Sequence, residues 1–142
     1  MNLVTDIGNS ACKAAVFRQG DIVDSWQWEN IAMHPLRRIL EKFPEIERAI
    51  ISSVRRNDAG LRNELEAAGI RVLVLDEHTP LPLKNRYRTP SSLGKDRLAA
   101  AVGANARFPE QNLLVIDAGT AITMDLVSAA NEYLGGNISP GL

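Results

Sequence analysis

The segment Asp6-Ile7-Gly8-Asn9-Ser10 near the start of the chain is echoed by Asp117-Ala118-Gly119-Thr120 in its last quarter. Each segment directly follows a short apolar run, and a second β-prone run comes after each of them. This pattern predicts a strand, a turn and a second strand in both places. Glycine lets the backbone turn tightly, so successive N–H groups can converge on an anionic oxygen, while the aspartate can hold a cation.

An Asp-x-Gly turn between two strands is also common in hairpins that bind no ligand. One copy alone therefore says little about function. Two copies, each followed by short polar side chains, favour a phosphate site. Facing each other, the two turns would hold a polyphosphate from both sides.

The composition is that of a folded globular protein with one ordinary core. The chain has 142 residues, 45% of them hydrophobic and 23% charged, and a net charge of -1. The arginine pairs lie between acidic neighbours, so we expect no nucleic-acid partner. A single cysteine, Cys12, cannot form an internal disulfide. Because the chain has neither a signal-like beginning nor a long apolar span, we expect a cytoplasmic protein without a membrane partner.

The order of predicted elements indicates the fold. Three strands (2–7, 11–17 and 22–28) form a meander and are followed by alternating helices and strands, a long loop (76–92) and an alanine-rich helix (96–107). One of the earlier helices can be capped by Asp58 and closed by Gly69. A second set of three strands begins at residue 113. This β-β-β-α-β-α-β-α unit, followed by the first strands of a second copy, predicts an α/β, ribonuclease-H-like fold of the actin and hexokinase superfamily. We expect a complete first domain over 1–110 and an incomplete second domain over 111–142.

Five motifs, in order along the chain, resemble those of type III pantothenate kinases. They are the 6–10 turn with Lys13, the strand 51–54, the segment Tyr87 to Arg97 that includes Gly94-Lys95-Asp96-Arg97, the run 117–125, and Gly135-Gly136-Asn137-Ile138-Ser139-Pro140-Gly141. The resemblance extends over essentially the whole chain. It implies transfer of the γ-phosphoryl group of ATP to the terminal hydroxyl of pantothenate, the first step of coenzyme A biosynthesis.

The resemblance gives Asp96 the role of the catalytic base that takes the proton of this hydroxyl. The first turn of a helix and the neighbouring Arg97 both favour an ionised carboxylate, which can accept a proton. Taken from the residues alone, Asp96 could equally be a helix-capping aspartate.

The same resemblance assigns the other site residues. It places the substrate beside Tyr87, Gly94, Lys95, Asp96 and Arg97, where the fork of Arg97 suits a carboxylate. It places ATP beside Asp6, Ile7, Gly8, Asn9, Ser10, Ala11, Cys12, Lys13 and Thr120. Asp117 would bind a monovalent cation, potassium or ammonium, and Mg-ATP is the expected cosubstrate. A homodimer is the expected assembly.

Family members normally continue well past residue 142, so the last strands are predicted to have exposed apolar faces and edges. The chain could therefore be an inactive fragment. The alternative function is that of a non-catalytic nucleotide-binding regulator of the same fold, of the transcription-accessory type. Asp96 favours the enzyme, because a regulator has no hydroxyl to deprotonate.

Overall fold

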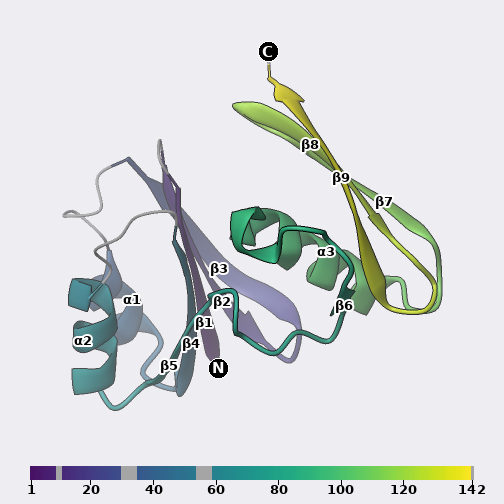
Figure 1. Ribbon diagram of the computed structural model, residues 1–142. Coiled ribbons are helices and arrows are strands. Elements are labelled where there is room, and N and C mark those ends of the chain that lie inside the picture. The colour runs from purple at the N-terminus through teal and green to yellow at the C-terminus, as the bar shows by residue number, and fades with distance from the viewer. Residues whose placement is uncertain (9–10, 30–34, 54–58, 142) are drawn as a thin grey trace. The chain divides into compact units, whose positions relative to one another are not determined.

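The computed structural model describes residues 1–8, 11–29, 35–53 and 59–141 (Figure 1). The chain divides into two compact units, Met1–Asp76 and Glu77–Leu142, each with its own sheet and its own buried apolar cluster. These bounds differ from the predicted domains 1–110 and 111–142, because helix α3 (Lys95–Arg107) packs on the second sheet. The division into one complete and one incomplete copy stays a prediction.

The sheet of the first unit has the strand order β3-β2-β1-β4-β5. Its first three strands pair antiparallel, whereas β4 pairs parallel with both β1 and β5. The strands are β1 (Asn2–Ile7), β2 (Cys12–Arg18), β3 (Asp21–Trp28), β4 (Arg48–Ser53) and β5 (Arg71–Val74). The predicted meander and the ribonuclease-H-like fold class are confirmed.

Two short helices cover one face of this sheet. They are α1 (Leu36–Lys42) and α2 (Ala59–Ala67), and apolar residues three or four positions apart are buried in each. Gly69 has a φ of 79° just after α2, which confirms it as the residue that closes this helix. Asp58, which the sequence predicts as the cap of α2, lies outside the described residues.

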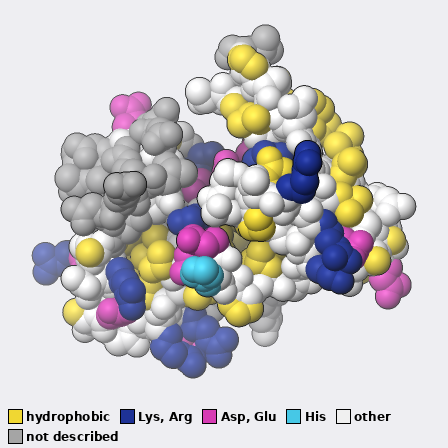
Figure 2. Space-filling view, in the orientation of Figure 1, with side chains coloured by type: hydrophobic (Ala, Val, Ile, Leu, Met, Phe, Trp, Pro, Cys, Tyr) yellow, Lys and Arg dark blue, Asp and Glu magenta, His cyan; other side chains and the backbone are white. Residues whose placement is uncertain are grey.

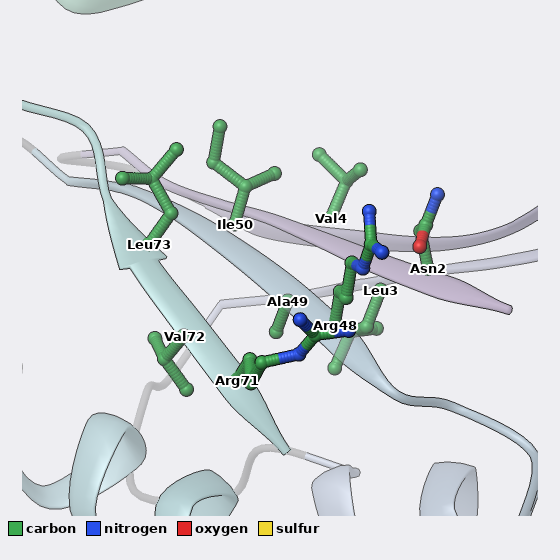
Figure 3. Close-up of a pocket in the computed structure, with 9 residues that line it drawn as sticks. All are labelled: Asn2, Leu3, Val4, Arg48, Ala49, Ile50, Arg71, Val72 and Leu73. Atoms are coloured by element: carbon green, nitrogen blue, oxygen red, sulfur yellow. The ribbon is translucent and has the colours of Figure 1, made fainter. Parts of the chain in front are cut away.

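The opposite face of the first sheet carries the apolar side chains of Val4, Ile50 and Leu73 (Figure 3). Side chains alternate along each strand, so Leu3, Ala49 and Val72 project to the helix-covered side, where they pack in or against the core (Figure 3). A shallow groove of about 520 Å³ crosses this end of the sheet. It is lined by these three residues together with Asn2, Val4, Arg48, Ile50, Arg71 and Leu73.

The sheet of the second unit has the order β6-β9-β8-β7. Its antiparallel strands β7 (Leu113–Ala118), β8 (Ala121–Val127) and β9 (Glu132–Pro140) match the second predicted set. Helix α3 buries Leu98 and Ala101 in a cluster with Val127 and Tyr133. It is the longest helix in the described ranges, with 13 residues, and none of the helices there has the length and apolar character to cross a membrane.

The predicted loop 76–92 contains two short elements that the sequence does not reveal. Strand β6 (Lys84–Asn85) pairs parallel with β9, and a 3-10 helix, η2, follows at Pro90–Ser92. Backbone hydrogen bonds from Lys84 to Asn131 (2.8 Å) and from Arg86 to Tyr133 (2.9 Å) attach the loop to the sheet. Two residues are too few to show a strand period, which explains why the pattern reads as loop.

The second sheet exposes an apolar surface on the face away from the core cluster. Leu114 and Ile116 are each 58% exposed and lie opposite Leu126 and Met124 of β8. Hydrophobic side chains are visible on the surface over these strands in the space-filling view (Figure 2). The prediction of exposed apolar faces on the last strands is therefore confirmed.

Candidate functional site

The first predicted phosphate turn joins β1 to β2. The backbone N–H of Gly8 donates to the carbonyl of Ala11 at 3.0 Å, and a Cβ added at Gly8 would lie 2.9 Å from that same oxygen. The turn is thus tight enough to require glycine at this position. Asn9 and Ser10 lie outside the described residues.

The predicted ATP-binding residues around this turn differ in whether their side chains are accessible to a ligand. Ile7 and Cys12 are fully buried in the core of the first unit, so only their backbone groups remain available. Lys13 is exposed, Ala11 is partly buried, and Asp6 lies directly across from Lys13 in the β1–β2 pair. An ammonium and a carboxylate therefore flank the start of the turn.

The second predicted turn joins β7 to β8 and is supported by the end of β9. Gly119 donates to the carbonyl of Ala121 at 2.9 Å, and Gly141 donates to the carbonyl of Thr120 at 3.0 Å. A Cβ at Gly141 would overlap the carbonyl oxygen of Gly119. Asp117 and Thr120 are both exposed beside this turn, where their oxygen atoms can reach a ligand.

The beginning of α3 carries the predicted catalytic residue. Gly94 precedes the helix, and its carbonyl accepts a hydrogen bond from Leu98 at 3.3 Å. Asp96 is exposed in the first turn of the helix, and its carboxylate folds back over Gly94. A Cβ at Gly94 would overlap Oδ1 of Asp96, so the glycine leaves the space that the carboxylate occupies.

Arg97, the next residue, forms a buried ion pair with Asp125 of β8. Its Nε donates to Oδ2 at 3.0 Å and its Nη2 donates to Oδ1 at 2.5 Å, a bidentate arrangement. Only 8% of Arg97 and 1% of Asp125 is exposed. The guanidinium is therefore fixed by a carboxylate of the chain itself.

Two tyrosines complete this cluster. The hydroxyl of Tyr133, on β9, donates to Oδ1 of Asp125 at 2.5 Å, and its side chain is fully buried. The ring of Tyr87 lies 6.3 Å from that of Tyr133, centroid to centroid. Tyr87 also packs against Gly135, where an added Cβ would lie 3.1 Å from the ring.

Charge and burial act on the titratable groups of the cluster. The hydrogen bonds to Asp125 raise the pKa of Arg97 above its ordinary value. Burial, and then the hydrogen bond to Asp125, raises the pKa of the Tyr133 hydroxyl. Arg97 thus stays cationic and Tyr133 stays a neutral donor at neutral pH.

The second unit brings together four of the five predicted substrate residues in one short stretch, Gly94 to Arg97, and links Tyr87 to it through Tyr133. A groove of about 610 Å³ lies beside Tyr87 and Gly135. Asp125 and Tyr133 are absent from the predicted site. Asp125 ends the quoted motif 117–125, and that is the one signal that could have drawn attention to it.

The donors in the two turns suit the expected ligands. Carboxylate and carbonyl oxygens beside Asp117 are hard ligands of the kind that alkali and magnesium ions prefer. Among the described residues there is no cluster of three or more His, Cys, Asp or Glu side chains that could hold a metal by themselves.

A family model and similar curated proteins both point to the same family. Residues 2–142 match the family model of type III pantothenate kinases. A type III pantothenate kinase of Phocaeicola vulgatus is 43% identical over 142 residues, which is 100% of this chain and 58% of the relative. One from Christiangramia forsetii is 43% identical over 143 residues, with the same coverage. The chain thus spans less than two thirds of these relatives.

Solved structures resemble the chain in fold. A protein of Campylobacter jejuni described as a Baf family transcriptional activator aligns with a TM-score of 0.55 at 24% identity, covering 99% of this chain and 55% of the other. The ethanolamine utilization protein EutJ of Carboxydothermus hydrogenoformans aligns with a TM-score of 0.53 at 14% identity, covering 98% and 51%. At these identities the likeness concerns the fold alone.

Proposed function

Because the chain belongs to the type III pantothenate kinase family, we propose that the protein transfers the γ-phosphoryl group of ATP to the terminal hydroxyl of pantothenate. The product would be 4'-phosphopantothenate, and the reaction the first step of coenzyme A biosynthesis. The observation that carries this proposal is the exposed carboxylate of Asp96, which lies over Gly94 and next to the anchored Arg97.

Asp96 acts as the general base. It lies in the first turn of α3, where the helix dipole favours a negative charge, and its side chain is exposed to an incoming alcohol. The carboxylate accepts the proton of the pantothenate hydroxyl as the oxygen attacks the γ-phosphorus, the bond from that phosphorus to the β–γ bridging oxygen breaks, and ADP leaves. A capping role is compatible with the same position, so a substitution that keeps the shape of the side chain is the decisive test.

Arg97 and Tyr87 bind the substrate. Asp125 holds the guanidinium rigid, so its remaining N–H groups can donate to the carboxylate of pantothenate without a loss of rotamer freedom on binding. The ring of Tyr87 offers a flat apolar surface for the carbon skeleton beside the groove in the second unit. Gly94 and Lys95 directly precede Asp96 in the sequence and are the remaining proposed substrate contacts.

Each of the two turns, taken by itself, offers groups that suit the phosphates of a nucleotide. Backbone N–H groups of residues 6–13 and the hydroxyl of Thr120 would contact phosphate oxygens, and Lys13 would neutralise part of their charge. Asp117 would hold the monovalent cation, potassium or ammonium. Magnesium bound with ATP would neutralise part of the charge of the phosphate groups. A homodimer and a cytoplasmic location are proposed from the family resemblance.

The test is ATP-dependent phosphorylation of pantothenate in the presence of magnesium and potassium. It compares this 142-residue chain with a version extended to the length of its relatives. We expect activity in the extended version. A folded, extended version that binds ATP but leaves pantothenate unmodified would contradict the proposal and favour a nucleotide-binding regulator.

A further inference from the structure

The second unit contains a buried ionic cluster that the proposed reaction does not by itself explain. Arg97, Asp125 and Tyr133 come from α3, β8 and β9, and all three are almost completely buried. Taking two charges out of water is expensive, and well-packed apolar side chains would often stabilise a fold as well or better. The cluster is therefore better explained by the orientation it gives to one of its members.

The hydrogen bonds leave Asp125 little freedom. Its Oδ1 accepts both from Nη2 of Arg97 and from the hydroxyl of Tyr133, each at 2.5 Å, and its Oδ2 accepts from Nε of Arg97 at 3.0 Å. A carboxylate held on both oxygens cannot rotate, and the guanidinium that it grips in two places cannot rotate either.

The guanidinium nevertheless keeps donors to spare. An arginine has five N–H groups, and Asp125 accepts from only two of the nitrogens, Nε and Nη2. Neither Nη1 nor the second hydrogen of Nη2 is used in these two bonds, so the guanidinium has donors left for an acidic ligand on one edge. That edge is the part of Arg97 that a substrate carboxylate would use.

We propose that Asp125 and Tyr133 are positioning residues that hold Arg97 in the single orientation in which its second edge selects a carboxylate on the substrate. Since pantothenate is the proposed acid, the inference rests on the proposed function. Neither residue has to touch the substrate. Tyr133 acts through its hydrogen bond to Asp125, and its ring also supports Tyr87, the other predicted substrate contact.

The test compares an acid with a neutral alcohol of the same shape. Pantothenate and panthenol differ only in that the carboxylate of the first is a hydroxymethyl group in the second. The measured quantity is the ratio of kcat/KM for the two compounds in the extended protein, together with the Kd of each in the absence of ATP. A change in the orientation of Arg97 should alter these ratios, because only pantothenate has the carboxylate. General damage to the fold should weaken the reaction and binding of both compounds and leave the ratios unchanged.

We expect Asp125→Asn to reduce the preference for the acid by about tenfold or more, because a hydrogen bond to a charged group is lost or misaligned. Tyr133→Phe keeps the ring and removes only the hydroxyl, so we expect a loss of about threefold to tenfold in the same ratio. Glu66→Gln makes the same carboxylate-to-amide change in an exposed ion pair with Arg62 on α2, and it should leave the ratio unchanged.

The outcomes separate the two proposals. If Tyr133→Phe and Asp125→Asn lower kcat/KM for the acid and the alcohol by the same factor, the positioning role is wrong. If Asp125→Asn does not fold, Tyr133→Phe decides the question alone. A changed Kd ratio in a protein that phosphorylates neither compound would support positioning and contradict only the proposed reaction. An unsubstituted protein that binds no pantothenate would overturn both.

Discussion

Replacing Gly94 by alanine should separate the placement of the Asp96 carboxylate, the proposed base, from the stability of the fold. The backbone at Gly94 has φ -59° and ψ 133°, a conformation that alanine adopts without strain. The added Cβ would overlap Oδ1 of Asp96 and lie 3.5 Å from its Cγ. Because Asp96 is exposed, its carboxylate can swing to another rotamer while the backbone stays in place.

The effect on stability should be small. Alanine restricts the unfolded chain and so stabilises by about 0.4–1 kcal/mol, while it is a poorer residue than glycine before a helix. These terms have opposite signs, so the free energy of unfolding should change by less than about 1 kcal/mol. The effect on the reaction should be large, because a displacement of about 1 Å can cost 10²-fold in rate, or about 2.7 kcal/mol in the activation free energy.

Gly103→Ala provides the matched control. It makes the same substitution in the same helix, and a Cβ there would meet nothing within 4 Å. It should stabilise the protein by about 0.5–1 kcal/mol and leave the rate unchanged. The assay is kcat for pantothenate phosphorylation by the extended protein, with urea unfolding of each variant. A kcat for Gly94→Ala within twofold of that of Gly103→Ala would refute the assigned position of the base.

Three further predictions concern other parts of the chain. Asp96→Asn should abolish turnover in the extended protein without altering its thermal unfolding, and near-normal rates in this variant would contradict its role as the base. Burial raises the pKa of the Tyr133 hydroxyl above its ordinary value of 10.0, so folding favours the neutral form. The resulting stability is present below pH 10 and is lost as the pH rises above it. Urea unfolding at pH 8 and pH 10.5 should therefore show a smaller loss in Tyr133→Phe than in the unsubstituted chain, and equal losses would count against this assignment. Finally, Leu114→Thr with Ile116→Thr should reduce binding of a hydrophobic dye to the 142-residue chain, since both side chains are 58% exposed; unchanged dye binding would mean that another surface is responsible.

The local elements could be predicted because each has a signal within a few residues. The strands of the first sheet alternate between buried and partly exposed residues, and glycine marks the turns that join β1 to β2 and β7 to β8. The start of α3 is visible in Gly94 and in the acidic residue of the first turn. These signals give the order of the elements and the neighbourhood of Asp96.

The partners of Arg97 could not be predicted in the same way, because they depend on tertiary pairing. Arg97 and Asp125 are 28 residues apart, and their contact exists only when α3 packs on β8. The position of Tyr133 depends further on an irregularity in the β8–β9 pair, where the register shifts between Leu126 and Val127. A shift of one residue exchanges the two faces of a strand, so alternation alone cannot say which side Tyr133 occupies.

The glycines of the second unit show how the site is shaped by missing side chains. Gly94 lies under the carboxylate of Asp96, and Gly135 lies against the ring of Tyr87. A Cβ at Gly136 would lie 2.7 Å from Oδ1 of Asp125 and would also overlap the carbonyl of Met124. Each of these three positions therefore leaves room for a side chain that carries charge or contacts the proposed substrate. Steric contacts thus explain why the last motif has glycine at both positions. Gly135 leaves room for the ring of Tyr87, and Gly136 lets β9 lie close to Asp125, the partner of Arg97.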